Sequence, residues 1–158
     1  MTRRTWRVAF GSAIAILVLA AGYQILPEGS TSVLAASNDV TFPALDQLEQ
    51  YTTVERGVTK EHMLTSRAAL DAIRAGRPVP TGTHVVLVDY QSGVLHRYLV
   101  SQKMGDGADS WQYQWFWPDR TIKADENTSR CYSCHQTRQD KQFMFTFEDA
   151  LDKSNDGS

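Results

Sequence analysis

The chain has 158 residues, of which 42% are hydrophobic and 22% are charged, and its formal net charge is −2. This length accommodates one globular domain with a substantial core rather than two domains. The slightly acidic balance gives no indication of the basic patch or stripe that nucleic-acid binding requires, so no nucleic-acid partner is expected. The two cysteines can form only one bridge, which excludes a small scaffold held together by disulfides.

The N-terminus has the pattern of a targeting segment. Residues 1–7 contain three arginines, and residues 8–26 contain no charged residue. This stretch is long for a cleaved signal peptide and close to the ~20 residues that span a membrane. Small residues from Val33 to Ala36 offer a cleavage site near Ala35 or Ala36. We predict a signal peptide or an uncleaved anchor, and favour a buried core helix less. Both favoured alternatives export the rest of the chain to the periplasm, anchored to the inner membrane if the segment is retained.

The predicted organisation has four parts. Residues 1–27 form the signal peptide or membrane anchor, and residues 28–41, rich in small and polar residues, form a linker. One domain covers residues 42–152, and a polar tail covers residues 153–158.

Two helices are predicted in the first half of the domain. A short helix is expected over residues 44–51. A clearer helix is expected over residues 66–75, because its apolar side chains recur at helical spacing. Ser66 or Thr65 can cap its start, and Gly76 can end it.

The middle of the domain changes to a strand pattern. Residues 83–90 and 94–100 are rich in β-branched and apolar residues and are separated by a short turn, which predicts a hairpin. A third strand is predicted over residues 110–117. After the cysteines, the alternating phenylalanines of residues 143–147 suggest an extended segment, followed by a final turn of helix.

The third predicted strand concentrates aromatic residues on one face. Alternate side chains of a strand point to opposite faces. One face therefore carries Trp111, Tyr113, Trp115 and Trp117, and the other carries Gln112, Gln114 and Phe116. Such an aromatic face packs either on a helix or beside a planar cofactor.

Both cysteines lie in one short stretch, RCYSCHQ, from Arg130 to Gln136. On a helical turn, residues three and four apart share a face, so Cys131 and Cys134 project the same way with His135 beside Cys131. Two thiols held like this can add across the two vinyl groups of haem b, and the histidine can then ligate the iron. The spacing C-x-x-C-H is typical of c-type haem attachment for this reason.

Two other uses of the cysteines compete with haem attachment. A structural zinc site needs four ligands, and no second Cys/His pair stands at suitable spacing. A redox or structural disulfide is permitted by export, but a thioredoxin-like pair would follow a strand in a βαβ unit, and here the pair follows a polar loop. We therefore predict one covalently attached haem c, with Cys131, Cys134 and His135 as cofactor-binding residues and His135 as the metal ligand.

The sixth coordination position of the iron has no clear candidate in the sequence. Methionine or histidine could fill it only by an accident of folding; the residues concerned are Met63, Met104, Met144, His62, His84 and His96. We favour a five-coordinate iron with an open distal face. An open site binds small ligands or does chemistry, whereas a six-coordinate site mainly carries electrons.

Several segments together resemble the cytochrome P-460 family, which includes the beta-type cytochromes c-prime. The resemblance covers roughly residues 42–151 and rests on residues 42–43, 74–77, 80–83, 110–113, 131–136 and 143–146. It implies an α+β fold, in which an antiparallel sheet with packed helices encloses one c-type haem. It also implies His135 as the proximal ligand, a vacant distal face and, by analogy, a homodimer.

The resemblance implies two kinds of activity. Members that oxidise hydroxylamine carry a lysine cross-linked to the haem, in the strand that corresponds to residues 84–89. That stretch has no lysine here, and Lys103 is a weak substitute that is more simply a solvated residue at a strand end. Members without the cross-link bind nitric oxide and shield the distal face with apolar side chains, for which Phe116 and Trp115 are candidates.

A carboxylate over the distal face would be needed for hydroxylamine oxidation. Asp125 and Glu126 precede the haem motif, and we name Glu126 as the candidate catalytic proton acceptor, although solvated loop charges are the simpler interpretation.

The predicted function is therefore an exported monohaem cytochrome that binds nitric oxide or a related small nitrogen species. The first alternative is a hydroxylamine- or nitric oxide-oxidoreductase that passes electrons to a redox partner protein. The second is a six-coordinate electron-transfer cytochrome.

Overall fold

The computed structural model of the chain describes residues 38–156. The predicted signal peptide or anchor, the linker up to residue 37 and the last two residues of the tail lie outside the described residues. None of the helices within residues 38–156 combines the length and the hydropathy that crossing a membrane requires.

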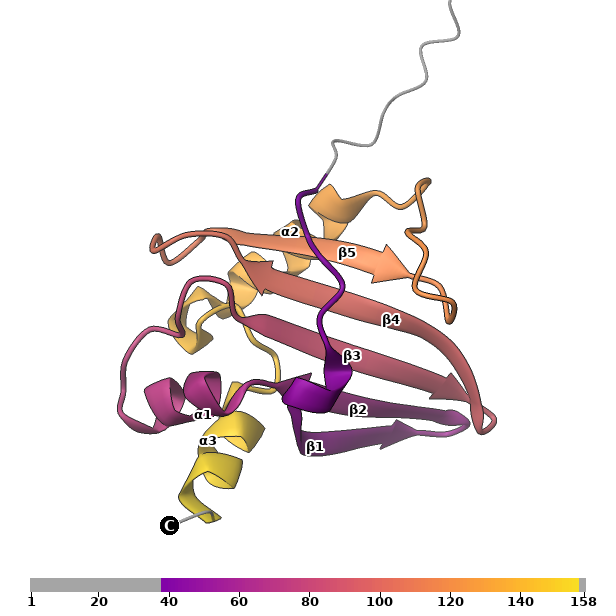
Figure 1. The fold of residues 1–158 in the computed structure, drawn as a ribbon. Coiled ribbons are helices and arrows are strands. Elements are labelled where there is room, and N and C mark those ends of the chain that lie inside the picture. Colours follow the sequence, from indigo (N-terminus) through magenta and orange to yellow (C-terminus); the bar gives the residue numbers. More distant parts are fainter. Residues whose placement is uncertain (1–37, 157–158) are drawn as a thin grey trace, which may run out of the picture. The chain divides into compact units, whose positions relative to one another are not determined.

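One antiparallel sheet organises the domain, and each strand pairs with the next along the chain (Figure 1). The sheet and its helices confirm the predicted α+β class at this level. The strands are β1 (Glu49–Arg56), β2 (Thr59–Thr65), β3 (His84–Gln91), β4 (Val94–Lys103) and β5 (Trp111–Phe116). The helices are α1 (Arg67–Arg74), α2 (Thr128–His135) and α3 (Phe147–Asp156), with short 3₁₀ helices η1 (Leu45–Gln47) and η2 (Gln136–Lys141).

The prediction of a helix over residues 44–51 is wrong in its second half. Only η1 is helical there, and the chain enters β1 at Glu49. Tyr51 is buried in the core, and its hydroxyl lies 2.6 Å from the hydroxyl of Thr146. The strand is therefore held by partners far away in the sequence, which a local helical pattern does not reveal.

The second predicted helix and the predicted hairpin both form. Ser66 Oγ accepts a hydrogen bond from the backbone N–H of Ala69 at 3.2 Å and caps α1. Gly76 follows this helix with φ +63°. In the turn between β3 and β4, Ser92 and Gly93 have φ values of 51° and 80°, as a two-residue hairpin turn with left-handed residues requires.

The extended segment predicted over residues 143–147 is wrong. Gln142 and Phe143 adopt left-handed backbone conformations, with φ values of 52° and 63°, so the chain turns at this point instead of continuing straight. α3 then begins at Phe147 and is longer than the single turn that was expected. The turn directs residues 143–146 back over the sheet, which matters for the site below.

The two faces of the sheet have separate cores, as the alternation in β5 predicts. Trp111 and Tyr113 belong to the core that includes residues of α1 and α3, whereas Phe116 packs on the other face with Val40 and Phe42. The N-terminal segment crosses this second face in Figure 1, whereas α2 lies behind β5 and α3 lies beside α1 next to β1. Val40 is buried, so the contacts of the domain begin inside the predicted linker.

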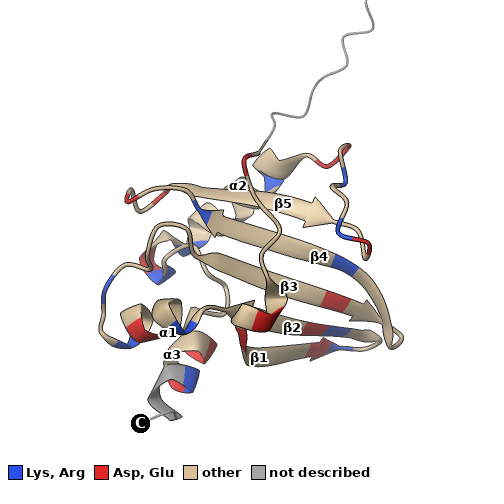
Figure 2. Cartoon of the chain, viewed as in Figure 1, with Lys and Arg blue, Asp and Glu red and all other residues tan. Residues whose placement is uncertain are grey.

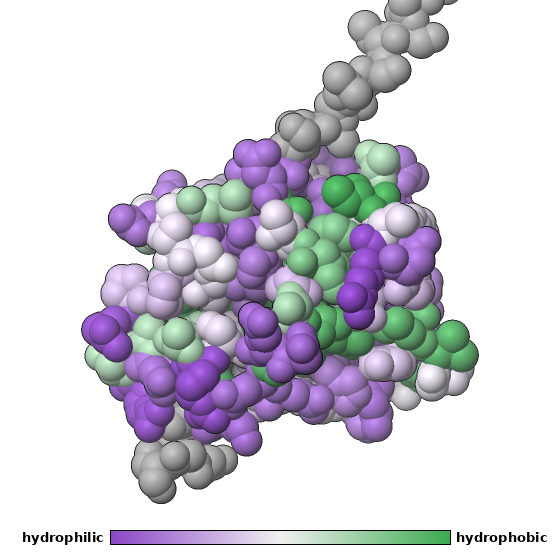
Figure 3. Space-filling view, viewed as in Figure 1, coloured by the Kyte–Doolittle hydropathy of each residue, from purple (hydrophilic) through white to green (hydrophobic). Residues whose placement is uncertain are grey.

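The face that the N-terminal segment crosses is partly hydrophobic at its surface. Figure 3 shows hydrophobic residues toward the end of the sheet where the hairpin turns lie. Val58, in the turn between β1 and β2, and Val94, the first residue of β4, are each 69% exposed. This surface lies away from the cavity described next.

Candidate functional site

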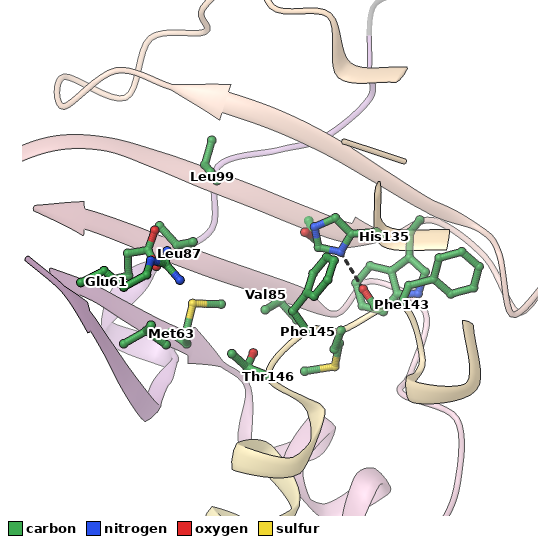
Figure 4. Close-up of a pocket in the computed structure, with 14 residues that line it drawn as sticks. Glu61, Met63, Val85, Leu87, Leu99, His135, Phe143, Phe145 and Thr146 are labelled. Carbon is green, nitrogen blue, oxygen red and sulfur yellow. Dashed lines mark hydrogen bonds and ion pairs between the residues drawn. The ribbon is translucent and has the colours of Figure 1, made fainter. Parts of the chain in front are cut away.

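A cavity of about 310 Å³ lies between the sheet and the turn at residues 143–146 (Figure 4). Every strand contributes to it, and where a strand supplies two residues they are alternate ones, because alternate side chains share a face. The cavity is mainly apolar and falls within the range of about 300–1,000 Å³ that is usual for ligand and cofactor sites. Its lining residues are Val54, Arg56, Glu61, Met63, Val85, Leu87, Leu99, Ser101, Trp111, His135, Phe143, Met144, Phe145 and Thr146.

His135 enters the wall of this cavity from the last residue of α2. Its Nδ1 lies 2.7 Å from the backbone carbonyl of Phe143, as Figure 4 shows by a dashed line. Its ring lies 4.6 Å from the ring of Tyr113 and 5.0 Å, edge to face, from that of Phe145. Contacts on several sides therefore fix the orientation of the imidazole.

The hydrogen bond also determines which nitrogen of His135 carries the proton. A carbonyl oxygen only accepts, so Nδ1–H is the donor and Nε2 of the neutral ring is left as a lone-pair donor. Burial lowers the pKa of His135, although the bond to Phe143 acts in the opposite direction. A neutral imidazole whose other nitrogen donates to a carbonyl is the usual arrangement of a metal-ligating histidine.

Both cysteines lie on the same helix as His135 and are free thiols. Cys131 is half-buried against the core, and burial followed by the charge of Glu126 raises its thiol pKa. Cys134 is exposed. The predicted helical turn therefore forms, and it presents two thiols and one imidazole within five residues.

Two buried donors beside this helix have no hydrogen-bond partner in the part of the chain that the structure describes. They are the indole N–H of Trp111, which lines the cavity, and the hydroxyl of Tyr113, which packs on His135. Burial raises the pKa of Tyr113, so its oxygen remains a protonated donor. Buried donors are usually paired, and a bound group with acceptor oxygens would fit here.

Asp125 and Glu126, the two carboxylates just before the Cys-x-x-Cys-His motif, do not line the cavity. Glu126 is buried but does not line the cavity; it is paired with Arg130 at 2.9 Å and with Lys123 at 3.4 Å. Asp125 is exposed and is bonded to Lys123 at 2.9 Å. Glu126 therefore contacts the start of α2 rather than the space into which His135 points.

Lysine is not among the residues that line the cavity within the described chain. Val85 and Leu87 occupy the cavity-facing positions of the stretch 84–89. The expectation that Lys103 is solvated is wrong, because it is only 3% exposed and its ammonium donates to Gly107 O and Ser110 Oγ.

Most of the other residues that the sequence analysis named as candidates do not line the cavity. Of the six methionines and histidines considered for the sixth position, only Met63 and Met144 line the cavity. His62 is bonded to Thr53 at 3.0 Å, His84 to Thr41 at 3.2 Å, and His96 lies near Trp115.

The two aromatic residues considered as a distal shield do not line the cavity. Phe116 lies on the opposite face of the sheet. Trp115 is outside the lining, and the guanidinium of Arg97 lies 4.3 Å from the centre of its ring. Phe143 and Phe145 are the phenylalanines that line the cavity.

Sequence reasoning missed the two charged residues of the cavity, Arg56 and Glu61. They are diagonal neighbours across the β1–β2 hairpin, with Arg56 Nη2 2.5 Å from Glu61 Oε2. The available signal was the alternation of Glu61 with Met63 and Thr65, which places a carboxylate among inward-facing positions.

No zinc-like ligand group is apparent in residues 38–156, where no three or more His, Cys, Asp or Glu side chains gather so as to hold a metal ion. No protein-family model matches the chain, and comparison with curated proteins gives no match either. A functional assignment therefore depends on the motif and on the geometry of the cavity.

Proposed function

We propose that the chain is an exported monohaem c-type cytochrome that binds nitric oxide or a related small nitrogen species at an open iron site. Cys131 and Cys134 would hold the haem by thioether bonds, and His135 would ligate its iron from the cavity wall. The haem would supply a vacant coordination position for the small ligand. The resemblance to the cytochrome P-460 family and the C-x-x-C-H pattern support the same proposal.

One observation carries the proposal: the helix that bears both thiols delivers His135 into an apolar cavity with Nδ1–H donated to Phe143 O. This bond orients the ring and leaves Nε2 unprotonated, as ligation requires. The unpaired donors of Trp111 and Tyr113 give further support, because the propionate oxygens of a haem are acceptors.

The apolar wall favours a small uncharged ligand. Met63, Val85, Leu87 and Leu99 give the space an apolar wall, and uncharged diatomic ligands lose little hydration on entering it. A hydroxylamine-oxidising cytochrome is the second candidate, because the carboxylate of Glu61 lines the same cavity. The family's lysine cross-link has no equivalent among the described lining residues, which favours ligand binding over this oxidation.

Mass spectrometry tests whether one haem is covalently attached to the chain. Wild-type protein co-expressed with a haem-maturation system is expected to gain the mass of one haem, without a further bond to lysine. The variant Cys131→Ala/Cys134→Ala is expected to remain at the mass of its amino acids, because both thioether bonds are removed. The same measurement reports whether the first segment is cleaved or retained. A colourless wild-type protein without added mass would overturn the proposal.

Absorption spectroscopy separates the candidate functions. A high-spin ferrous spectrum that changes on addition of nitric oxide is expected. A low-spin spectrum that ignores the ligand would indicate the electron-transfer alternative, with Met63 or Met144 as the first residues to substitute. A red-shifted ferrous band of the P-460 type would indicate the hydroxylamine-oxidising enzyme and its redox partner.

A further inference from the structure

The turn that carries Phe143 has an uncommon backbone. Gln142 and Phe143 both have positive φ, and neither is glycine, asparagine or aspartate, the residues that usually adopt this conformation. Left-handed backbone at other residues persists only where surrounding contacts hold it, and it concentrates at functional sites. The contacts of Gln142 show what holds this turn.

The side-chain amide of Gln142 joins the turn to the loop that follows α1. Its Oε1 accepts a hydrogen bond from the backbone N–H of Val79 at 2.7 Å, and its Nε2 donates to the carbonyl of Arg77 at 3.2 Å. Both ends of the amide are used, and each has the partner that its chemistry requires. The partners lie 63 and 65 residues before Gln142, so this amide bridge fixes two segments that are distant in the sequence.

The amide bridge is anchored in the core. The two segments that it joins, the loop after α1 and the segment after α2, lie toward the left of Figure 2, where each carries basic residues. A neutral amide joins them without adding charge. Val79 is 3% exposed and shares a core cluster with Phe143, so the position of the bridge is fixed by packing as well as by its hydrogen bonds.

The bridge stands one residue before the carbonyl that orients His135. Phe143 O lies 2.7 Å from Nδ1 of His135, and the N–H of Phe143 donates to Arg138 O at 2.8 Å. The position of this carbonyl is thus determined by the bridge on one side and by η2 on the other. Gln142 does not line the cavity that His135 enters, so its effect on the site passes through the backbone.

We propose that Gln142 is a positioning residue for His135: its amide bridge holds Phe143 O in place and thereby sets how much electron density the imidazole gives to the iron. A hydrogen bond from Nδ1–H to a carbonyl makes a ligating imidazole more basic. A more basic ligand stabilises ferric iron relative to ferrous iron and so lowers the midpoint potential. This inference rests on the proposed function and adds to it a residue outside the cavity that tunes the iron.

The test uses the haem-loaded protein and two measurements on the iron. Resonance Raman spectroscopy of the ferrous form gives the iron–histidine stretching frequency, and potentiometric titration gives the midpoint potential. Gln142→Ala is expected to lower the frequency and raise the potential, because the bond to Phe143 O is weakened. Gln139→Ala is the matched control, since Gln139 lies in the 3₁₀ helix that Gln142 caps and its side chain is exposed. This control is expected to change neither value.

Two further variants separate the amide from the backbone. Gln142→Gly adopts the left-handed conformation without cost but lacks both bonds, and it is expected to shift both values in the same direction as Gln142→Ala. Gln142→Glu keeps the length of the side chain and an acceptor for Val79 N–H but loses the donor to Arg77 O, and an intermediate lowering of the frequency is expected. If Gln142→Ala fails to fold, these two variants carry the test.

A destabilised variant shows whether the shifts depend on the bridge. Phe42→Ala opens the core on the other face of the sheet and is expected to leave both the frequency and the potential unchanged. The same shifts in Phe42→Ala as in Gln142→Ala would overturn the inference, because general loss of stability would then explain them.

The remaining outcomes separate this inference from the proposed function. Wild-type frequency and potential in Gln142→Ala and Gln142→Gly, with haem attached, would overturn the role of Gln142 and leave the proposed function intact. A wild-type protein without haem would overturn both proposals.

Discussion

At the scale of single residues, the bond between His135 and Phe143 has the largest consequence. The acceptor is a backbone carbonyl, so no side-chain substitution at residue 143 removes it directly. It becomes available because Gln142 and Phe143 are left-handed and turn the chain toward α2. A strained backbone position thus orients the imidazole on which the proposed function depends.

Substitution of His135 tests its role as the axial ligand. His135→Gly is expected to keep the haem attached through Cys131 and Cys134 but to lose the spectrum of the histidine-ligated protein. Added imidazole is expected to restore that spectrum, because it can occupy the space of the missing ring. Absorption spectra with and without imidazole provide the measurement. A spectrum that His135→Gly leaves unchanged would show that another residue ligates the iron.

At the scale of elements, the β1–β2 hairpin completes the cavity. β1 and β2 supply Val54, Arg56, Glu61 and Met63, and therefore both charged groups of the lining. Charged residues at these positions made the hairpin hard to predict, since a strand is recognised by apolar residues on its inner face. The same departure from the pattern is what indicates function in this part of the sheet.

The start of β3 is joined to the N-terminal segment through His84, whose Nε2 lies 3.2 Å from Thr41 Oγ1. Burial lowers the pKa of His84, while hydrogen bonds to Gln102 and Thr41 raise it in part. A histidine whose folded pKa is depressed stabilises the fold only while it is neutral. Its contribution is present above the unfolded pKa of about 6.5 and is lost as the pH falls below that value.

Chemical denaturation between about pH 5 and pH 7.5 measures this effect. The wild-type protein is expected to lose free energy of unfolding as the pH falls, and His84→Gln is expected to lose less over the same range. Parallel curves for the two proteins would contradict the assignment to His84.

At the scale of the whole domain, the two faces of the sheet differ in what lies against them. One face holds the cavity, and the other is covered by the N-terminal segment through Val40 and Phe42. The Phe42 ring packs edge-on against Tyr98 at 5.0 Å and Phe116 at 5.2 Å. Substitutions on the two faces should therefore separate stability from ligand binding.

A matched pair of phenylalanines tests this separation. Phe42→Ala is expected to lower the free energy of unfolding by roughly 2–4 kcal/mol and to leave ligand affinity unchanged, because it opens a gap on the face away from the cavity. Phe145→Ala is expected to cost less stability, because Phe145 is 49% exposed, but to alter ligand affinity, because its ring contacts His135. Denaturation curves and nitric oxide titrations of the haem-loaded variants measure both effects. Equal changes in affinity would contradict the division of tasks.

Patterns that are local in the sequence predicted their structures well. The cap at Ser66, the Ser92–Gly93 turn and the alternation in β5 each depend on residues within a few positions of one another. The spacing of Cys131, Cys134 and His135 likewise specifies a helical turn with two thiols and an imidazole. The alternation in β5 and the spacing of the cysteines and His135 follow from the strand period of 2 and the helix period of 3.6 residues, whereas the cap and the turn depend on individual side chains and backbone angles.

The sequence by itself therefore determined the helical turn that carries Cys131, Cys134 and His135, and it determined α1, the β3–β4 hairpin and the aromatic strand. Tertiary structure alone decided that Phe143 O meets His135, that Glu61 rather than Glu126 lines the cavity, and that Lys103 is buried away from it. The physical reason is that these contacts depend on strand register and on where the chain turns back over the sheet. Both are set by packing between residues far apart in the sequence, which no local period records.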